Sequence, residues 1–551
     1  MFSLTQRELE IAERCIDKVA RKHKVAAACV YGSKAAGYAR PDSDIDLLVV
    51  LDGYPLTIRY AYLREEGLEI SLLIVSKRAL EADAKNGALG EFVSGRLLHI
   101  YEPIVNPSLL QSIERKYKRR VILEELQAMI DCTSLLGTEI LFPLEYVVFS
   151  KIRQRISRYP NATYSYYRTY FHSPSAGQNL QFALRGYHDA LAEILVDGRE
   201  LFSRSDDLLQ ISDRAIFVDK GKVRLKLAKR LQQVGSYIVH TYAGREVMHL
   251  MVKEAESKIR RRINESIQLP DNMESPARSY WSLPEGSLIV ESRDWLEELA
   301  ARRGYVKSRI AHRRRLGNVN SRTMLYTITH SQGDYQIVVK ELARTKSIKW
   351  AALSLWTSPV KRFKVGPLFR LGTEYRGIRF IRRLGLNAPT IEAVVLNERL
   401  LVTGYVEGRT MSDVIRGCIK GKDESDLLRT AGDQVAKMHN SGASFGNIKP
   451  KNIILSGSRM FFTDMEQFSF SSTDQVWDLA QFICWGLKGT RDSRAATRVV
   501  RELLQGYMDG SKDRANILAL AKSRRYVESF FPVLSPSVAR AIKNEIRHAA
   551  G

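Results

Sequence analysis

The stretch Val25–Gly53, VAAACVYGSKAAGYARPDSDIDLLVVLDG, joins two apolar runs through a Gly-Ser pair and a segment of small residues. Apolar runs bounded by turn residues predict a strand, a turn, a short helix and a second strand. Asp44 and Asp46 lie two residues apart at the start of the second run, and side chains two apart on a strand point to one face. The sequence therefore predicts two carboxylates on the same side of a sheet edge.

Two carboxylates this close disfavour joint ionisation unless a cation lies between them. Their oxygens suit Mg²⁺ (or Mn²⁺), which keeps several waters and also takes substrate phosphates. The Gly32-Ser33 turn ahead of the short helix can direct backbone N–H groups at those phosphates. We expect a metal and a nucleoside triphosphate to meet at this edge; the alternative is an ordinary acidic turn that caps a strand.

These residues resemble the signature of the DNA polymerase beta superfamily of nucleotidyltransferases, in which Gly-Ser is followed after about ten residues by Asp-x-Asp on a strand. The resemblance implies a third carboxylate on a later strand, and Glu69 stands in a suitable apolar setting, GLEISLLIVSK. It also implies in-line attack of an acceptor hydroxyl on the α-phosphate of a nucleotide. The implied site comprises catalytic, metal-binding carboxylates at Asp44, Asp46 and Glu69 and phosphate-binding residues at Gly32 and Ser33.

The chain has 551 residues, of which 44% are hydrophobic and 26% charged. At about 150 residues per domain, this length predicts roughly three or four globular units. We expect a multi-domain α/β and α+β protein with a polymerase-beta-like nucleotidyltransferase domain (1–105), a mainly helical middle domain (106–275) and a third domain (276–551). No apolar run approaches the roughly 18 residues of a spanning helix, so we expect a cytoplasmic protein without a transmembrane segment.

The middle region shows helical periodicity in residues 108–132 and 245–263. Between these segments lies a tyrosine-rich stretch, and its aromatic rings can stack on a nucleobase or an RNA acceptor. The alternative, which we favour, is that they pack in the core and at its rim. The tyrosines concerned are Tyr164, Tyr166, Tyr167 and Tyr170.

The last region carries residue types that a nucleotide-phosphate site needs, in a set order. A lysine neutralises phosphate oxygens, a glutamate holds the lysine, and an asparagine and an aspartate take the metal. Lys340 and Asp464 each follow an apolar strand pattern, Glu374 lies in a predicted helix, and Asn452 lies in ASFGNIKPKNIIL, residues 443–455. Together these residues predict a nucleotide-binding site with a metal at Asn452 and Asp464.

This order resembles the protein-kinase-like superfamily, and most closely the small archaeal kinases of the RIO and KEOPS-associated types. The resemblance implies a bilobal kinase-like fold over residues 276–551, with ATP as ligand. It places Asn447 where those kinases have an aspartate that aligns the acceptor hydroxyl, and an amide cannot accept a proton. We therefore predict a nucleotide-binding pseudokinase; a slow transferase and an empty scaffold are the alternatives.

Most of the net charge of +24 lies in the last region. Residues 302–333 carry basic residues and no acidic one before Asp334, and residues 342–372 are also basic, with tryptophan and phenylalanine interleaved. This mixture is typical of surfaces that bind RNA or tRNA. The alternatives are a solvated basic face with the aromatics turned inward, and a helix at a membrane surface.

Our first functional hypothesis is a magnesium-dependent nucleotidyltransferase that moves a nucleoside monophosphate from NTP to an acceptor hydroxyl. RNA or tRNA is the favoured acceptor, and a protein is possible. One alternative is an atypical serine/threonine kinase whose nucleotidyltransferase-like domain selects the target. Another is a regulatory binding protein that senses ATP.

Overall fold

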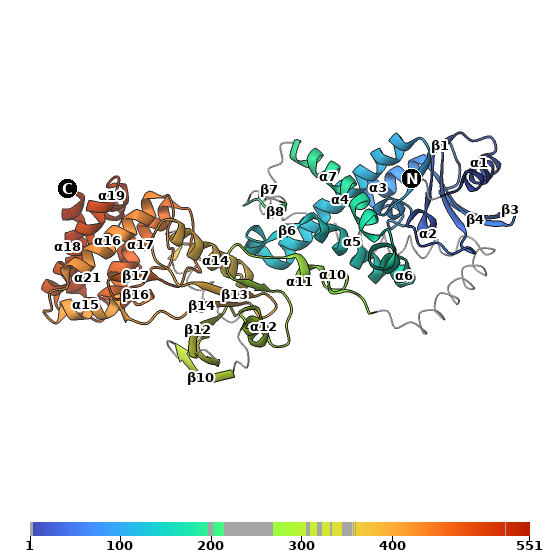
Figure 1. The fold of residues 1–551 in the computed structure, drawn as a ribbon. Coiled ribbons are helices and arrows are strands. Elements are labelled where there is room, and N and C mark those ends of the chain that lie inside the picture. Colours follow the sequence, from blue (N-terminus) through green and yellow to red (C-terminus); the bar gives the residue numbers. More distant parts are fainter. Residues whose placement is uncertain are drawn as a thin grey trace. The chain divides into compact units, whose positions relative to one another are not determined.

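The computed structural model describes residues 4–196, 202–205, 207–213, 268–304, 309–316, 322–330, 333–343, 355, 357–358, 360–523 and 525–551. Its architecture is mixed α/β and multi-domain, as predicted (Figure 1). The chain divides into two compact units. The amino-terminal unit is Met1–Met129 with Leu141–Trp281, and the carboxy-terminal unit is Ile130–Ile140 with Ser282–Gly551. The helix predicted over 245–263 lies outside the described residues.

A five-stranded sheet in the order β3-β4-β2-β1-β5 forms the base of the amino-terminal unit. The predicted strand, turn, short helix and strand are β1 (Val25–Tyr31), α2 (Gly32–Ala35) and β2 (Ile45–Leu51). β2 runs antiparallel to β1 and parallel to β4. The remaining strands are β3 (Ile58–Glu65), β4 (Leu68–Ser76) and β5 (Glu102–Val105).

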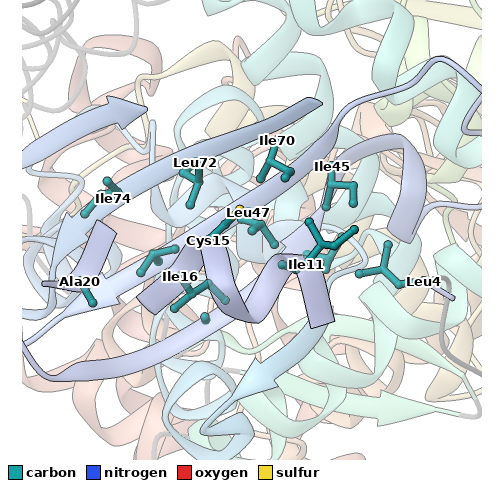
Figure 2. Close-up of a cluster of buried hydrophobic side chains, with 14 of the residues drawn as sticks. Leu4, Ile11, Cys15, Ile16, Ala20, Ile45, Leu47, Ile70, Leu72 and Ile74 are labelled. Carbon is teal, nitrogen blue, oxygen red and sulfur yellow. The ribbon is translucent and has the colours of Figure 1, made fainter. Parts of the chain in front are cut away.

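Helix α1 (Gln6–Ala20) covers one face of this sheet. Thr5 and Glu8 form a capping box at its start, which satisfies backbone N–H groups that the helix leaves unpaired. Ile11 and Cys15 of α1 lie in a buried cluster with Ile45 and Ile70 (Figure 2). Because strand side chains alternate, the residues on either side of Ile45 and Ile70 point to the opposite face.

Helices complete the amino-terminal unit. The helix predicted over 108–132 is α4 (Pro107–Thr133). Tyr166 and Tyr170 are 5% exposed, which confirms the core interpretation for these two residues. The other elements are α3 (Lys77–Asn86), η1 (Ser94–Leu98), α5 (Leu144–Arg158), η3 (Pro160–Ala162), α6 (Thr163–Tyr167), η4 (Arg168–His172), α7 (Ala176–Val196), α10 (Asp271–Glu274), α11 (Pro276–Tyr280) and a small sheet of β6 (Leu141–Pro143), β8 (Leu208–Ile211) and β7 (Phe202–Ser205).

The carboxy-terminal unit begins with a six-stranded sheet in the order β10-β11-β12-β14-β13-β9. Ile337, Val339 and Val402 lie in its buried core with Leu299 of α12 (Trp295–Arg302). Helix α14 (Pro367–Arg383) belongs to the same unit. The strands are β9 (Ser287–Ile289), β10 (Arg309–Leu316), β11 (Thr323–His330), β12 (Gly333–Glu341), β13 (Ile391–Val395) and β14 (Leu400–Gly404).

A mainly helical part with one small sheet follows. Hairpin β16 (Ile453–Ser456) to β17 (Arg459–Phe462) is flanked by Asn452 before it and by Asp464 after it. No helix in the described part of the chain is long and apolar enough to cross a membrane. The other elements are β15 (Arg409–Thr410), η7 (Pro450–Asn452), α15 (Met411–Ile419), α16 (Ser425–Asn440), α17 (Ser472–Gly486), α18 (Ser493–Gly510), α19 (Ala515–Lys522), α20 (Arg525–Glu528), η8 (Phe531–Val533) and α21 (Pro536–Ala550).

Candidate functional sites

The three predicted carboxylates of the amino-terminal unit lie on one face of its sheet. In the pairing of β2 with β4, Ile45 is opposite Ile70 and Asp46 is opposite Ser71. Continuing this register by one residue sets Asp44 beside Glu69. Since Ile45 and Ile70 point into the α1 core, these carboxylates point to the other face. Asp44 and Asp46 are half-buried and Glu69 is exposed, so the face is open to a ligand.

Gly32 lies directly against Asp46. Its φ is +79°, and a Cβ built on it would lie 2.2 Å from Oδ2 of Asp46. Any larger residue would collide with the carboxylate and would also strain the backbone. The predicted phosphate turn and the predicted metal carboxylates therefore meet at one place. Ser33 is half-buried in the first turn of α2.

The turn after α2 is fixed by the helical part of the same unit. The carbonyl of Ala36 accepts hydrogen bonds from Oγ of Ser173 at 2.8 Å and from Nδ2 of Asn179 at 3.0 Å. A Cβ on Gly37 would lie 2.7 Å from Oγ of Ser175. The helical region thus positions the loop that leads from the Gly-Ser turn to Asp44.

In the carboxy-terminal unit, Lys340 of β12 is surrounded by carboxylates. Its Nζ lies 2.9 Å from Glu374 of α14, 2.6 Å from Asp464 and 2.9 Å from Glu466. Burial lowers the pKa of Lys340, but the three carboxylates outweigh burial and hold this pKa well above its usual value. Burial raises the pKa of Glu374 to about 7. Lys340 is therefore a permanent cation in this cluster.

Asp464 is held by two amides. Nδ2 of Asn447 and Nδ2 of Asn452 each donate a hydrogen bond to its Oδ2 at 3.0 Å. Oδ1 of Asn447 accepts a hydrogen bond from Gln481 at 3.3 Å, and Asn447 is only 2% exposed. The structure thus brings Asn447 and Asn452 together with Asp464, Lys340 and Glu374.

Glu466 is a further member of this cluster that the sequence did not single out, because it belongs to no recognised motif position. In the described part of the chain, the acidic side chains whose oxygens all lie within 4.8 Å of one another are Glu374, Asp464 and Glu466. Asp44, Asp46 and Glu69 share a face without gathering this tightly. The two clusters therefore differ: one is closed around a lysine, and the other is open.

Comparison with known proteins finds a matching family model and similar proteins. Residues 12–129 match the family model "Nucleotidyltransferase domain". The KEOPS complex subunit Bud32 of Pyrococcus abyssi is 22% identical over 161 residues, which are 28% of this chain and 73% of that protein. A probable serine/threonine-protein kinase, the BUD32 homolog of Archaeoglobus fulgidus, is 33% identical over 97 residues, 18% of this chain and 45% of that protein.

The chain combines a nucleotidyltransferase domain with a kinase-like region. The chain spans less than half the length of the Archaeoglobus relative. Transferase activity in general follows from the nucleotidyltransferase domain.

In the kinase-like region, α14 is anchored by a segment from far earlier in the chain. Residues Ile130–Ile140 belong to the carboxy-terminal unit, and they include η2 (Ser134–Thr138). Glu139 accepts a hydrogen bond from Nε of Arg376 at 2.9 Å and pairs with Arg379. A Cβ on Gly372 would lie 2.4 Å from the backbone N of Leu136. This segment therefore holds the helix that carries Glu374.

The two basic regions behave differently. Arg313, Arg314 and Arg315 are exposed on β10, which is the edge strand of its sheet. By contrast, Lys361 is 2% exposed and pairs with Asp474 at 2.6 Å, and Arg370 pairs with Glu466 at 2.5 Å.

Phe363 is buried as well. These members of region 342–372 therefore stabilise the fold of the kinase-like region. Other parts of both regions lie outside the described residues: 305–308, 317–321, 331–332, 344–354, 356 and 359.

Proposed function

We propose that the protein is a magnesium-dependent nucleotidyltransferase that moves a nucleoside monophosphate from NTP to an acceptor hydroxyl. The observation that carries the proposal is the common face of Asp44, Asp46 and Glu69 beside Gly32. These are oxygen ligands of the kind that Mg²⁺ or Mn²⁺ binds, and their face is open to phosphates. A bound metal pair would stabilise the entering and leaving oxygens of the displacement.

Residues of the chain itself would hold the metal, position the phosphates and accept the proton. Asp46 lies on β2 and Asp44 directly precedes this strand, whose other face packs into the α1 core and fixes the backbone. Gly32, which has no side chain, lets the phosphate turn lie directly against Asp46. Glu69, level with Asp44, takes the proton of the attacking hydroxyl, alone or with Asp46.

The kinase-like region serves as a nucleotide-binding module with little or no phosphotransfer. Lys340 neutralises phosphate charge, Glu374 orients Lys340, and Asn452 with Asp464 takes a metal. The buried amide of Asn447 removes general-base help of roughly 10²- to 10⁴-fold. The sheet with Lys340, helix α14 and the following helical part support a bilobal kinase-like fold for this region.

RNA or tRNA is the favoured acceptor, and a protein is possible. The exposed arginines of β10 support a nucleic-acid acceptor, because clustered cations on a surface attract the phosphate backbone. A binding affinity for RNA that does not fall steeply with salt would count against this acceptor.

Labelled nucleotides test the proposal against its alternatives. We expect transfer of α-label from one of the four NTPs to RNA or protein, abolished by Asp44→Asn and retained in Asp464→Asn. Transfer of γ-label instead, lost in Asp464→Asn, would identify an atypical kinase. Saturable ATP binding without either transfer would identify an ATP-sensing binding protein.

A further inference from the structure

Three tyrosines surround Asp46 on the face of the nucleotidyltransferase sheet that bears the carboxylates. Tyr31 is the β1 residue paired with Asp46. Tyr62 of β3 is paired with Ser71 of β4, which is in turn paired with Asp46, so Tyr62 points to the face of Asp46. Tyr60 is two residues before Tyr62 on the same strand and therefore points to this face as well. Burial raises the pKa of both Tyr31 and Tyr38, and the charge of Asp46 raises each pKa further, so Tyr38 also lies near this carboxylate.

Arg96 of η1 lies over the first of these rings. Its guanidinium carbon is 5.2 Å from the ring centroid of Tyr31 and 5.1 Å from that of Phe92. Cations at this distance from an aromatic face are held by the ring's electrostatics. Since Tyr31 immediately precedes Gly32, Arg96 is positioned beside the start of the phosphate turn.

Arg168 lies over the ring of a tyrosine that follows the same turn. Its guanidinium carbon is 5.6 Å from the ring centroid of Tyr38, which follows α2, and 6.0 Å from that of Tyr164. The Tyr38 hydroxyl lies 3.0 Å from Oγ of Ser165, which fixes the ring. Arg96 and Arg168 therefore approach the loop from Gly32 to Asp46 from two elements of the helical part, η1 and η4.

Neither arginine has a carboxylate partner within the described ranges of the chain. Nε of each is buried and has no hydrogen-bond partner among the described residues. Nearby cations are neutralised: Arg120 and Lys151 each lie 2.8 Å from Glu91. The Arg96 side chain also hydrogen-bonds to Tyr31 and Tyr60, which are neutral groups. A half-buried guanidinium without an anion keeps an uncompensated charge, which an anionic ligand would neutralise.

We propose that Arg96 and Arg168 bind the triphosphate of the nucleotide beside the Gly32-Ser33 turn. This inference rests on the proposed nucleotidyltransferase function and adds two binding residues to it. The planar guanidinium groups of the two arginines match the geometry of phosphate oxygens. In this arrangement the α-phosphate would be held at the face of the carboxylates, and the guanidinium groups would neutralise the β- and γ-phosphates.

Nucleotide binding by the full chain tests this inference. Titration calorimetry would use α,β-methylene-bridged NTPs, which cannot react, and NMPs, in a Lys340→Met background that removes the lysine of the kinase-like site. We expect Arg96→Gln and Arg168→Gln each to weaken NTP binding roughly 10- to 100-fold and NMP binding much less. Arg96→Lys should recover part of the loss.

Arg59→Gln is the matched control, because Arg59 is exposed on β3 and alternates with Tyr60, so it points away from the carboxylates. NTP binding by Arg96→Gln and Arg168→Gln equal to that of this control would overturn the inference. Equal losses for NTP and NMP, together with a lower melting temperature, would also overturn it, since both residues would then be structural.

The measurements also distinguish nucleotide phosphates from acceptor phosphates as the ligand of the arginines. They further separate failure of this inference from failure of the proposed transferase function. Unchanged NTP affinity with a raised KM for the RNA acceptor would assign the arginines to acceptor phosphates and overturn the inference. If wild-type protein binds NTP through Arg96 and Arg168 but transfers no α-label, the inference holds and the proposed transferase function fails. If it binds no triphosphate in the Lys340→Met background, both fail.

Discussion

Nδ2 of Asn447 donates a hydrogen bond to Oδ2 of Asp464 at 3.0 Å in the kinase-like region. Asn447→Asp would replace this donor with a further carboxylate, directly beside Asp464 in the buried cluster. We expect the free energy of unfolding to fall by about 1–3 kcal/mol without metal, because like charges this close repel. Mg²⁺ with ATP should restore more stability to the variant than to wild type, measured as the shift in melting temperature. Asn397→Asp, at an exposed position, is the control; equal metal-free stability of both variants would contradict the prediction.

Gly32→Ala should strongly reduce nucleotidyl transfer. The added methyl group would lie 2.2 Å from Oδ2 of Asp46, so the carboxylate must move, and the backbone at φ +79° is strained as well. We expect at least about a 100-fold loss of transferred α-label, as is usual when catalytic groups are displaced. Gly53→Ala is the matched control, since Gly53 has φ +64° and no neighbour within 4 Å. Similar activity losses in both variants would mean that backbone strain alone is responsible.

Glu139→Gln should weaken the attachment of α14 and so lower the free energy of unfolding. Glu139 pairs with Arg376 and Arg379, and the side chains of Glu139 and Arg379 are each 8% exposed. Removing one partner of a buried ion pair costs about 3–5 kcal/mol, because the remaining charge is left without compensation. ATP affinity should fall with it, since α14 carries Glu374. In the exposed pair of Arg429 with Glu502, the change Glu502→Gln should cost less than about 1 kcal/mol. Urea unfolding compares the two variants, and equal costs would argue against the anchoring of α14.

Glu91 should make the folding stability of the amino-terminal unit depend on pH in the acid range. Burial raises its pKa, but Lys151, Arg120 and Arg155 outweigh burial and lower this pKa from 4.5 to about 2. The folded pKa is below the unfolded one, so the stabilisation is present above pH 4.5 and is lost as pH falls toward 2. The full contribution of Glu91 to the free energy of unfolding is about 3 kcal/mol.

Glu91→Gln should therefore destabilise the protein strongly at pH 7, and the difference from wild type should narrow below pH 4.5. Denaturant unfolding at a series of pH values measures this difference. Glu124→Gln is the control, because Glu124 also pairs with Arg120 at 2.9 Å but is 48% exposed. A stability difference for Glu91→Gln that stays constant from pH 5 to pH 3 would contradict the assignment.

The nucleotidyltransferase face was predictable because its determinants are local. Alternation from Asp44 into β2 sets Asp44 and Asp46 on one face, and the Gly-Ser turn lies shortly before them in the sequence. Arg96 and Arg168 could not be found this way, since their place depends on how η1 and η4 pack against the sheet and no motif marks them.

The basic regions show that a charge pattern in the sequence does not predict which charged side chains are buried. A run of lysines and arginines is typical of a solvated or nucleic-acid-binding surface. In the structure, however, Lys361 is buried against Asp474 and Arg370 is buried against Glu466. These partners lie about a hundred residues later in the chain, and a one-dimensional pattern does not contain such pairings. The same holds for Glu139 and α14, which are far apart in sequence.

The placement of residues 130–140 within the carboxy-terminal unit bears on how such a chain can change during evolution. Because this segment lies in sequence between the two parts of the amino-terminal unit, no single cut of the chain separates the two units cleanly. A recombination event that exchanged either half for a homologous one would also have to preserve the match between Glu139 and its two arginines. The two halves are therefore expected to be inherited together.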